Sequence, residues 1–367
     1  MNTKDVISEL STEEREAERQ KRKRRALRKK IVTIVDRIFG FILATCIVFG
    51  LAGLALEYVL IKGPSPALKE TFVMTMLETR RFGFIPHIFL TDEEMNEMKD
   101  LRKQDTNAKM DESLINLSGG DSGGQEADPG TDQQESPYPA DEDGDGIIFE
   151  NIKGNGFVGY MLTILDPTRV FVGMPDGYGG VGLRLDELVN KYGALGGINA
   201  GGFYDDGGGG LGGNPDGLTI IDGVVYNEGH GTDCIVGLNE EGLMYVGYYT
   251  LDEALGLGLK NCVSFSPLLI QNGVGLDVSS SGVNPRTAIA QRSDGAIMML
   301  VIDGRQAHSM GARYQDVVDI LLDYGAVNAI NLDGGSSTVM WYEGDYVNSC
   351  SSENGICRPL PNAFLFK

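Results

Sequence analysis

The chain has 367 residues, which is enough for about two domains of ordinary size. Apolar residues make up 42% and charged residues 23%, as in globular proteins, and the 51 glycines follow no regular period, which excludes a collagen-like chain. The formal charge of −21 is unevenly distributed: residues 1–37 hold 12 Lys and Arg against 7 Asp and Glu, and the remainder holds 19 against 45. An exterior this acidic repels polyphosphates, which argues against a nucleic-acid-binding protein.

A basic cluster precedes an uncharged apolar run near the N-terminus. Eight Lys and Arg lie between Lys21 and Lys30, and residues 38–56 carry no charge. Such a run spans roughly 28 Å as a helix, close to the thickness of the hydrocarbon layer. We therefore expect a single transmembrane helix over residues 38–61, with residues 1–37 as a basic cytoplasmic tail and the rest extracellular. A cleaved signal peptide is the alternative, although the charged leader is longer than that pattern allows.

Two different segments follow the apolar run. Residues 62–102 interleave apolar side chains such as Phe72 and Met76 with charges, which predicts a helical stalk. Residues 103–146 hold 12 acidic residues, two Lys, three Pro and repeated Gly and Ser. That composition buries too little apolar surface to offset chain entropy, so we expect a disordered, self-repelling acidic linker.

The end of this linker resembles the start of a calcium-binding loop. Residues 141–146 read D-E-D-G-D-G, which matches the first half of that pattern. The twelfth position would be Ile152, which supplies no bidentate carboxylate. Calcium binding is therefore one interpretation of this run and a plain solvated acidic run is the alternative, and no other cofactor is predicted.

Residues 147–367 are predicted to form the folded domain. Short β-rich runs are separated by Gly, Asp-Gly and Asn-Pro turns, and two stretches have the apolar spacing of helices. The expected strands are Thr219–Ile221, Ala296–Ile302 and Ala329–Leu332, and the expected helices are Leu183–Tyr192 and Tyr314–Tyr324. A strand, a helix and a further strand in succession indicate a crossover onto a sheet, so the predicted class is α+β (mixed α/β), a sheet-based domain with few helices.

Four of the five cysteines lie in this domain. An even number of cysteines in an extracellular domain fits two disulfides, and four cysteines allow three pairings. We favour the short loop from Cys350 to Cys357, which would leave Cys234 and Cys262 for the second bond. A zinc site is the competing interpretation, but the chain has no C-x-x-C spacing.

Three glycine-flanked segments place polar side chains at the ends of apolar runs, where strands deliver them to a loop-lined cleft. The first is Gly196–Asp205, with the sequence G-G-I-N-A-G-G-F-Y-D. The second begins N-P-R-T-A at Asn284 and continues to D-G-R at Asp303–Arg305. The third is N-L-D-G-G-S-S-T over Asn331–Thr338. The order and spacing of the three segments are more specific than any one of them.

Together these segments resemble the phosphodiester glycosidase family, which contains domains of the uncovering-enzyme type. The resemblance covers about residues 147–367, and the predicted anchor and stalk are similar to those of Gram-positive members. It implies an extracytoplasmic hydrolase that cleaves the bond between an anomeric carbon and a phosphate in a sugar-1-phosphodiester. The resemblance does not identify the sugar.

The cations inside these segments are the expected phosphate ligands. The domain has only 11 Lys and Arg against 25 Asp and Glu, so Arg286 and Arg305 stand out. A guanidinium matches phosphate oxygens in a bidentate arrangement. The alternative is that either arginine forms a structural ion pair. Further phosphate contacts are expected from the N–H groups and hydroxyls of one turn, which contains Gly334, Gly335, Ser336 and Ser337.

Asp333 and Asp303 are the predicted catalytic carboxylates. One would stabilise or attack an oxocarbenium-like carbon, and the other would orient water or sugar hydroxyls. Asp before Gly also forms turns, which is the structural alternative for both. Ser336 as a nucleophile is disfavoured because the chain has no G-x-S-x-G elbow, and His308 lies close enough in sequence to act as an acid or base.

Hydrogen-bonding and aromatic side chains of the first two segments are the expected sugar ligands. These candidates are Asn199, Phe203, Tyr204, Asp216 and Thr287. Their alternative roles are turn capping and core packing.

Two functions from different classes remain. The preferred one is an anchored hydrolase acting on phosphate-linked glycans of the cell envelope or on exopolysaccharide. The other is a non-catalytic protein that binds glycan during export of exopolysaccharide or wall polymer. Turnover distinguishes them, since both predict glycan contact and neither involves nucleic acid.

Overall fold

A computed structural model describes residues 12–79, 82–100, 108–117, 138–177, 179–204, 210–278, 280–352 and 355–367. Contacts within the chain divide it into two compact units, Met1–Ser65 and Pro66–Lys367.

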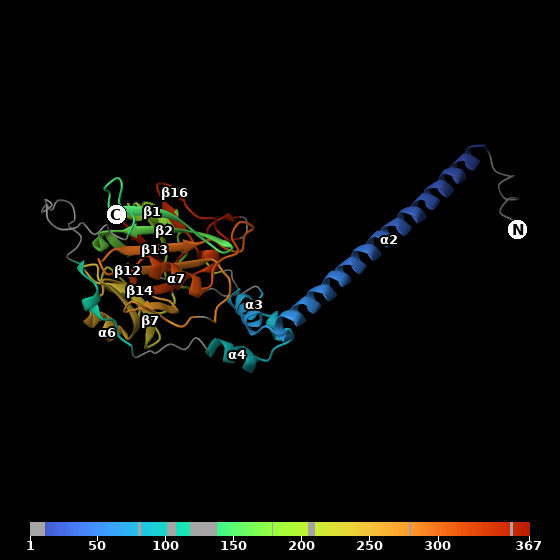
Figure 1. The fold of residues 1–367 in the computed structure, drawn as a ribbon. Coiled ribbons are helices and arrows are strands. Elements are labelled where there is room, and N and C mark those ends of the chain that lie inside the picture. Colours follow the sequence, from blue (N-terminus) through green and yellow to red (C-terminus); the bar gives the residue numbers. More distant parts are fainter. Residues whose placement is uncertain are drawn as a thin grey trace. The chain divides into compact units, whose positions relative to one another are not determined.

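The first unit contains one long helix, α2, which runs over Thr12–Lys62 (Figure 1). Its apolar part, with a mean hydropathy of 2.4 in the most apolar window, makes it long and apolar enough to cross a membrane. The hydroxyl of Thr45 donates to the carbonyl of Phe41 at 2.8 Å, so this polar group is satisfied within the helix. The helix begins well before residue 38, because the charged residues that precede the apolar run are also good helix formers.

The second unit is built around a seven-stranded sheet in the order β1-β2-β13-β12-β14-β10-β11. Figure 1 labels β1, β2, β13, β12 and β14 of this sheet next to one another, with helix α7 beside them. Every adjacent pair in the sheet is antiparallel. The strands are β1 (Ile147–Gly154), β2 (Phe157–Ile164), β10 (Leu268–Gln271), β11 (Val274–Gly275), β12 (Arg286–Arg292), β13 (Ile297–Ile302) and β14 (Ala326–Leu332).

Two further sheets have five strands each, in the orders β16-β15-β4-β17-β3 and β6-β5-β9-β7-β8. The first comprises β3 (Val170–Gly173), β4 (Gly196–Asn199), β15 (Met340–Tyr342), β16 (Asp345–Tyr346) and β17 (Ala363–Phe366). The second comprises β5 (Thr219–Ile221), β6 (Val224–Asn227), β7 (Asp233–Leu238), β8 (Met244–Tyr249) and β9 (Asn261–Ser264).

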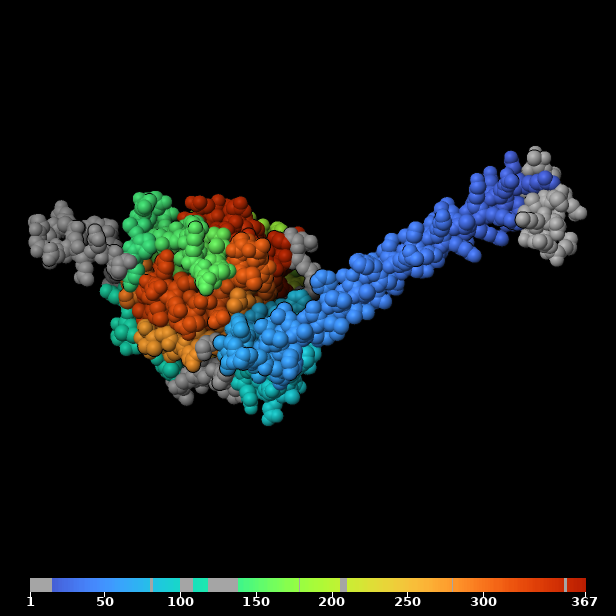
Figure 2. Space-filling view, turned by 45° about the vertical axis from the view of Figure 1, so that its right-hand side comes forward, coloured from blue at the N-terminus to red at the C-terminus, as the bar shows by residue number. Residues whose placement is uncertain are grey.

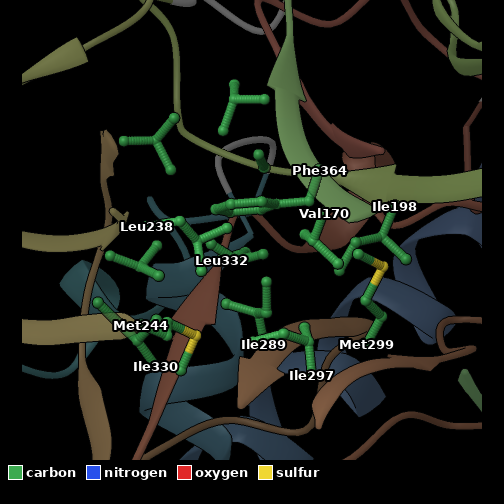
Figure 3. Packing of buried hydrophobic residues seen from close by; sticks show 14 of the residues in the cluster. Val170, Ile198, Leu238, Met244, Ile289, Ile297, Met299, Ile330, Leu332 and Phe364 are labelled. Atoms are coloured by element: carbon green, nitrogen blue, oxygen red, sulfur yellow. The ribbon is translucent and has the colours of Figure 1, made fainter. Parts of the chain in front are cut away.

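The main core lies between the seven-stranded sheet and the two smaller sheets (Figure 3). Side chains alternate along each strand, so Ile289 faces this core while Ala288 and Ala290 face the opposite side of the sheet. The central strands have apolar residues on both faces because both faces are covered. These strands therefore hold the polar residues at their ends in fixed positions.

One helix covers the outer face of each sheet. Helix α7 (Tyr314–Asp323) packs on the seven-stranded sheet, α5 (Leu185–Tyr192) on the β4 sheet, and α6 (Leu251–Gly256) on the β7 sheet. The structure confirms the predicted α+β class and both predicted helices to within two residues at each end. The crossover is also present, because β13 and β14 both run antiparallel to β12 and are joined through α7.

Short segments that precede β1 also pack on the folded unit. Helices α3 (Pro66–Glu78) and α4 (Asp92–Asp100) belong to it, and Figure 2 shows light-blue residues of α3 beside its orange part. The unit also contains the short helices η1 (Pro86–Ile88), η2 (Glu112–Leu114), η4 (Pro167–Arg169) and η6 (Gly335–Ser337). The helical segment expected as a separate stalk is thus partly a layer of the folded unit.

The expected acidic linker over residues 103–146 is ordered where the structure describes it. Ile115 is buried against the β7 sheet, and Lys109 pairs with Glu253 at 3.1 Å. The prediction of disorder is therefore wrong for residues 108–117, because a few apolar residues among the acids find a surface to cover. Residues 103–107 and 118–137 lie outside the described residues.

The cysteines confirm one predicted bond and correct the other. Cys350 and Cys357 form a disulfide. Cys234 and Cys262 are free, buried thiols. They lie on the neighbouring strands β7 and β9, but Cys234 faces the main core and Cys262 faces the opposite side of the sheet. Side chains on opposite faces cannot be bridged, so the expectation of a second disulfide is wrong.

Candidate active site

The three glycine-flanked segments meet at one edge of the seven-stranded sheet. Strand β12 begins at this edge, whereas β13 and β14 end there. Asn199, at the end of β4, accepts a hydrogen bond from the hydroxyl of Thr287 at 2.9 Å and donates to the carbonyl of Asp333 at 2.5 Å. One buried amide therefore joins all three segments.

Asn199 and Thr287 are almost completely buried, with 1% and 0% of each residue exposed. The side-chain oxygen of Asn199 also accepts from the backbone N–H of Val339 at 3.0 Å. These contacts hold the ends of β4, β12 and β14 together. The structure thus places these two of the five predicted sugar ligands in contacts that join strand ends.

Two arginines and an asparagine gather above these strand ends. Arg305 donates from Nε and Nη2 to the side-chain oxygen of Asn284, at 3.2 and 2.8 Å. Its backbone adopts φ 58°. A Cβ added to Gly335 would lie 3.2 Å from Arg305 Nη1, so the guanidinium lies against the glycine turn. We call Arg286, Arg305, Asn284 and residues 334–336 the arginine cluster.

Arg286 lies in the same cluster and is held on several sides. Its Nε donates to the carbonyl of Ala312 at 3.0 Å and its Nη2 donates to that of Gly282 at 2.5 Å. The guanidinium lies 3.8 Å from the ring centroid of Tyr314. With 5% of its side chain exposed, Arg286 is a fixed, buried cation.

A carboxylate from helix α3 lies directly on this cation. Glu78 Oε2 accepts from Arg286 Nη2 at 2.9 Å and from Asn284 Nδ2 at 2.6 Å, and its Oε1 accepts from the N–H of Gly282 at 3.3 Å. A guanidinium, an amide and a backbone N–H are the donors that phosphate uses in proteins. The structural ion pair weighed for Arg286 is therefore present, and its partner comes from 208 residues earlier in the chain.

The charges of this cluster influence one another. Loss of solvation around the guanidinium lowers the pKa of Arg305, Arg286 lowers it further, and Glu78 acts in the opposite direction. Arg305 also donates to the hydroxyl of Thr79 at 3.2 Å, just beyond the end of α3. Two cations at close range favour an anion between them.

The turn after β14 forms the floor of the cluster. The N–H of Asp333 donates to the carbonyl of Ala200 at 3.0 Å, and the N–H of Gly335 donates to that of Pro285 at 3.1 Å. Gly335 adopts φ 62°, a conformation that favours glycine. Asp333 and Ser336 are half-buried, whereas Ser337 is buried.

Asp303 lies at the same sheet edge but its carboxylate is fully enclosed. Oδ1 accepts from Asn348 Nδ2 at 3.1 Å and from the N–H of Ser349 at 3.0 Å, and Oδ2 lies 3.0 Å from Nε2 of the half-exposed His308. A cavity of about 500 Å³ next to the disulfide is bordered by Asn348 and Ser349 of this network. The structure thus places Asp303 as an anchor of the loop that carries Arg305.

The remaining predicted sugar ligands separate. Phe203 is buried, Tyr204 is 76% exposed, and Asp216 borders an open cleft. We call this space, of about 340 Å³, the His230 cleft. Its lining residues are Gly202, Asp216, Gly217, His230, Thr232, Asp233, Cys234, Tyr248, Ser264, Phe265 and Ser266.

Comparison with known proteins agrees with this geometry. A family model described as "Phosphodiester glycosidase" matches residues 192–367, which include all three segments. Residues 192–367 form a phosphodiester glycosidase domain. The match includes the whole arginine cluster and Asp333, whereas Glu78 lies outside it.

Two relatives extend this result. The "SPbeta prophage-derived uncharacterized protein YomE" of Bacillus subtilis is 31% identical over 180 residues, which are 44% of this chain and 26% of that protein. The chain therefore matches about a quarter of that relative's length. The catalytic domain of zebrafish N-acetylglucosamine-1-phosphodiester alpha-N-acetylglucosaminidase, solved as "auto-inhibited by pro-peptide", has a TM-score of 0.52 at 22% identity, covering 60% of this chain and 81% of that one. This likeness supports the fold.

Sequence reasoning missed one cation of the phosphodiester glycosidase domain. Arg358 donates to the hydroxyl of Ser336 at 3.3 Å, and its guanidinium lies 4.6 Å from the ring centroid of Phe203. It follows the disulfide cysteine Cys357 and lies in no recognisable motif. The scarcity of cations in the domain was the one available signal.

The missed groups of the His230 cleft are His230 itself and Asp233. Nδ1 of His230 lies 3.1 Å from Asp233 Oδ1, and Nε2 lies 3.4 Å from Asp216 Oδ1. The hydrogen bond and charge of Asp233 raise the pKa of His230, and the charge of Asp216 adds to this. The i, i+3 spacing of His230 and Asp233 was the available signal.

The acidic run weighed for calcium is described in part. Oxygens of Asp141, Asp143 and Asp145 lie within 4.8 Å of one another. All three side chains accept hydrogen bonds from the loop's own backbone, for example from the N–H of Gly146 to Asp141 at 2.9 Å. These bonds account for the clustering as a turn, and Ile152 lies in strand β1 rather than in the loop.

Proposed function

We propose that this chain is a membrane-anchored, extracytoplasmic phosphodiester glycosidase that hydrolyses a sugar-1-phosphodiester in cell-envelope or exopolysaccharide glycans. One observation carries the proposal: Arg286, Arg305 and the glycine turn lie at the sheet edge where β14 ends, just before Asp333. The family assignment of residues 192–367 supports the reaction class.

The reaction breaks the bond between C1 of the sugar and the phosphate oxygen. The electron pair leaves with the phosphate, water supplies hydroxide to C1, and the released proton goes to solvent. The products are a reducing sugar and a phosphate monoester. Because the leaving group is already anionic, the main requirement is stabilisation of charge by preorganised cations and N–H donors.

Each group has a distinct role in this proposal. Arg286, Arg305 and the Gly334–Ser337 turn hold the phosphate, and Asp333 faces the positive charge that develops at C1. Asn199 and Thr287 fix the strand ends, and Asp303 anchors the loop before Arg305 through its three partners.

The proposed enzyme is latent in this conformation. The Glu78 carboxylate, with 15% of its side chain exposed, already uses the donors that a phosphate needs. The zebrafish relative is described as auto-inhibited by a pro-peptide, which supports the same arrangement here. Helix α3 must leave before a phosphodiester binds to Arg286.

The membrane location rests on the N-terminal unit and on the cysteines. The apolar part of α2 follows a segment rich in Lys and Arg, which favours a cytoplasmic N-terminus. The Cys350–Cys357 disulfide fits an oxidising compartment for the domain.

Turnover in isotopic water tests the proposal. The full chain in detergent is incubated with methyl esters of several sugar 1-phosphates in H₂¹⁸O, and the released methyl phosphate is analysed by mass spectrometry. We expect methyl phosphate without ¹⁸O, because the C1–O bond breaks and the oxygen from water goes to the sugar. Label on the phosphate would show cleavage at phosphorus and would overturn the proposal, as would a lack of turnover in both the wild type and Glu78→Gln. A lack of turnover together with saturable glycan binding would favour the non-catalytic alternative.

A further inference from the structure

The His230 cleft lies beside the proposed reaction centre. One wall contains Gly202. This residue lies two positions after Ala200, whose carbonyl accepts a hydrogen bond from the N–H of Asp333. Another contains Ser266, whose carbonyl accepts from Asn331 Nδ2 at 3.0 Å. Both walls are therefore tied to the last residues of β14, so a molecule in the cleft lies next to the Asp333 end of that strand.

The polar groups of the cleft suit hydroxyl donors. Asp216 has 57% of its side chain exposed, and a carboxylate accepts hydrogen bonds but donates none. Asp233 is 10% exposed and orients His230. Among the described residues that line the cleft there is neither Lys nor Arg, and the charged groups are two carboxylates and one imidazole. A further carboxylate brought by a ligand would be repelled by these two, and the imidazole of His230 is already paired with Asp233.

Two aromatic residues supply the apolar part. The half-buried residues Tyr248 and Phe265 also line the cleft. A sugar ring has an apolar C–H face and a rim of hydroxyl groups, so it matches a site that combines aromatic faces with a few acceptors. The volume of about 340 Å³ accommodates one or two sugar rings.

We infer that the His230 cleft is the subsite for the sugar ring, and that it accepts neutral sugars and rejects sugars that carry a carboxylate. The inference rests on the proposed function and adds to it the substrate class and the residues Asp216, His230, Asp233, Tyr248 and Phe265. It divides the substrate between two places: phosphate on the arginine cluster and sugar in the His230 cleft.

Matched substrate pairs test the inference. The pairs are 1-phosphate methyl esters of glucose and glucuronic acid, galactose and galacturonic acid, and N-acetylglucosamine and its uronic acid. They differ at C6, where CH₂OH replaces a carboxylate. We expect kcat/KM to be at least 10-fold higher for a neutral member, and Asp216→Asn to reduce this ratio at least threefold. Asp222→Asn, in the exposed turn between β5 and β6, should leave it unchanged.

Equal kcat/KM values within every pair, or an unchanged ratio in Asp216→Asn, would overturn the inference while leaving the proposed function intact. A binding readout separates the two ideas if turnover fails. The ring signals of His230, assigned with His230→Gln, are followed by NMR in the full chain as each free sugar is added. We expect shifts with a neutral sugar and none with its uronic acid; shifts with neither, or equally with both, refute the subsite.

Discussion

The arginine cluster and the His230 cleft belong to the same phosphodiester glycosidase domain but differ in how far their side chains are exposed to solvent. Arg286 is 5% exposed and already bonded to Glu78, whereas His230 and Asp216 are 68% and 57% exposed. The anion-binding half is thus satisfied by the chain's own carboxylate, while the proposed sugar half is open. We therefore expect Glu78 to control the binding of phosphate but not the binding of sugar.

The largest expected effect comes from substitution of Asp333, because this residue lies between the arginine cluster and the His230 cleft in the proposed site. Asp333→Asn removes the charge facing C1, and we expect kcat to fall about 1,000-fold, the scale for losing one charge-stabilising group. Sugar binding in the His230 cleft should persist. The matched control is Asp323→Asn on the exposed last turn of α7. Similar activity in both variants would remove Asp333 from the reaction centre.

Arg305 tests the arginine cluster alone. Arg305→Gln keeps hydrogen-bonding groups but loses the charge, and we expect kcat/KM for a sugar-1-phosphodiester to fall about 100-fold. The exposed Arg313 before α7 provides the control substitution Arg313→Gln. A loss in Arg313→Gln equal to that in Arg305→Gln would indicate a general effect of net charge.

The disulfide borders the arginine side and not the His230 cleft. Replacing Cys350 and Cys357 with Ala opens a loop of sequence separation 7, and we expect a loss of about 2–3 kcal/mol in the free energy of unfolding. Urea unfolding of the full chain in detergent measures it. An unchanged midpoint would show that other contacts already hold the loop that carries Arg358.

The smallest effect concerns proton binding in the His230 cleft. Asp233 raises the pKa of His230, so the folded chain binds this proton more tightly than the unfolded chain. The resulting stabilisation is fully present below pH about 6.5 and is lost as the pH rises through the folded-state pKa. NMR titration should give a His230 midpoint above that value, and Asp233→Asn should lower it. If the His230 midpoint in Asp233→Asn equals that in the control Asp222→Asn, the pairing of His230 with Asp233 is refuted.

Local sequence predicted much of the fold because the relevant signals are short-range. The apolar spacing of residues 314–324 and the glycine that follows defined α7 almost completely. The three segments predicted the sheet edge, because strands deliver their terminal residues to loops. The disulfide between Cys350 and Cys357 followed from their closeness in sequence.

Long-range pairings could not be read from the sequence. Glu78 meets Arg286 only because α3 packs on the folded unit, and the sequence of the predicted stalk carries no sign of that partner. The opposite faces of Cys234 and Cys262 depend on strand register, which a two-residue period fixes only after the strands are placed. Arg358 and His230 reach the site through tertiary contacts of this kind.

The most direct test is binding of a non-hydrolysable sugar-1-phosphonate, measured by calorimetry on the full chain in detergent. If Glu78 occupies the phosphate site, Glu78→Gln should tighten binding about 10-fold, and adding Arg305→Gln should abolish the gain. Glu70→Gln, about 12 Å earlier on the same helix, should bind like the wild type. Unchanged affinity in Glu78→Gln, or a gain that survives the loss of Arg305, would contradict the account.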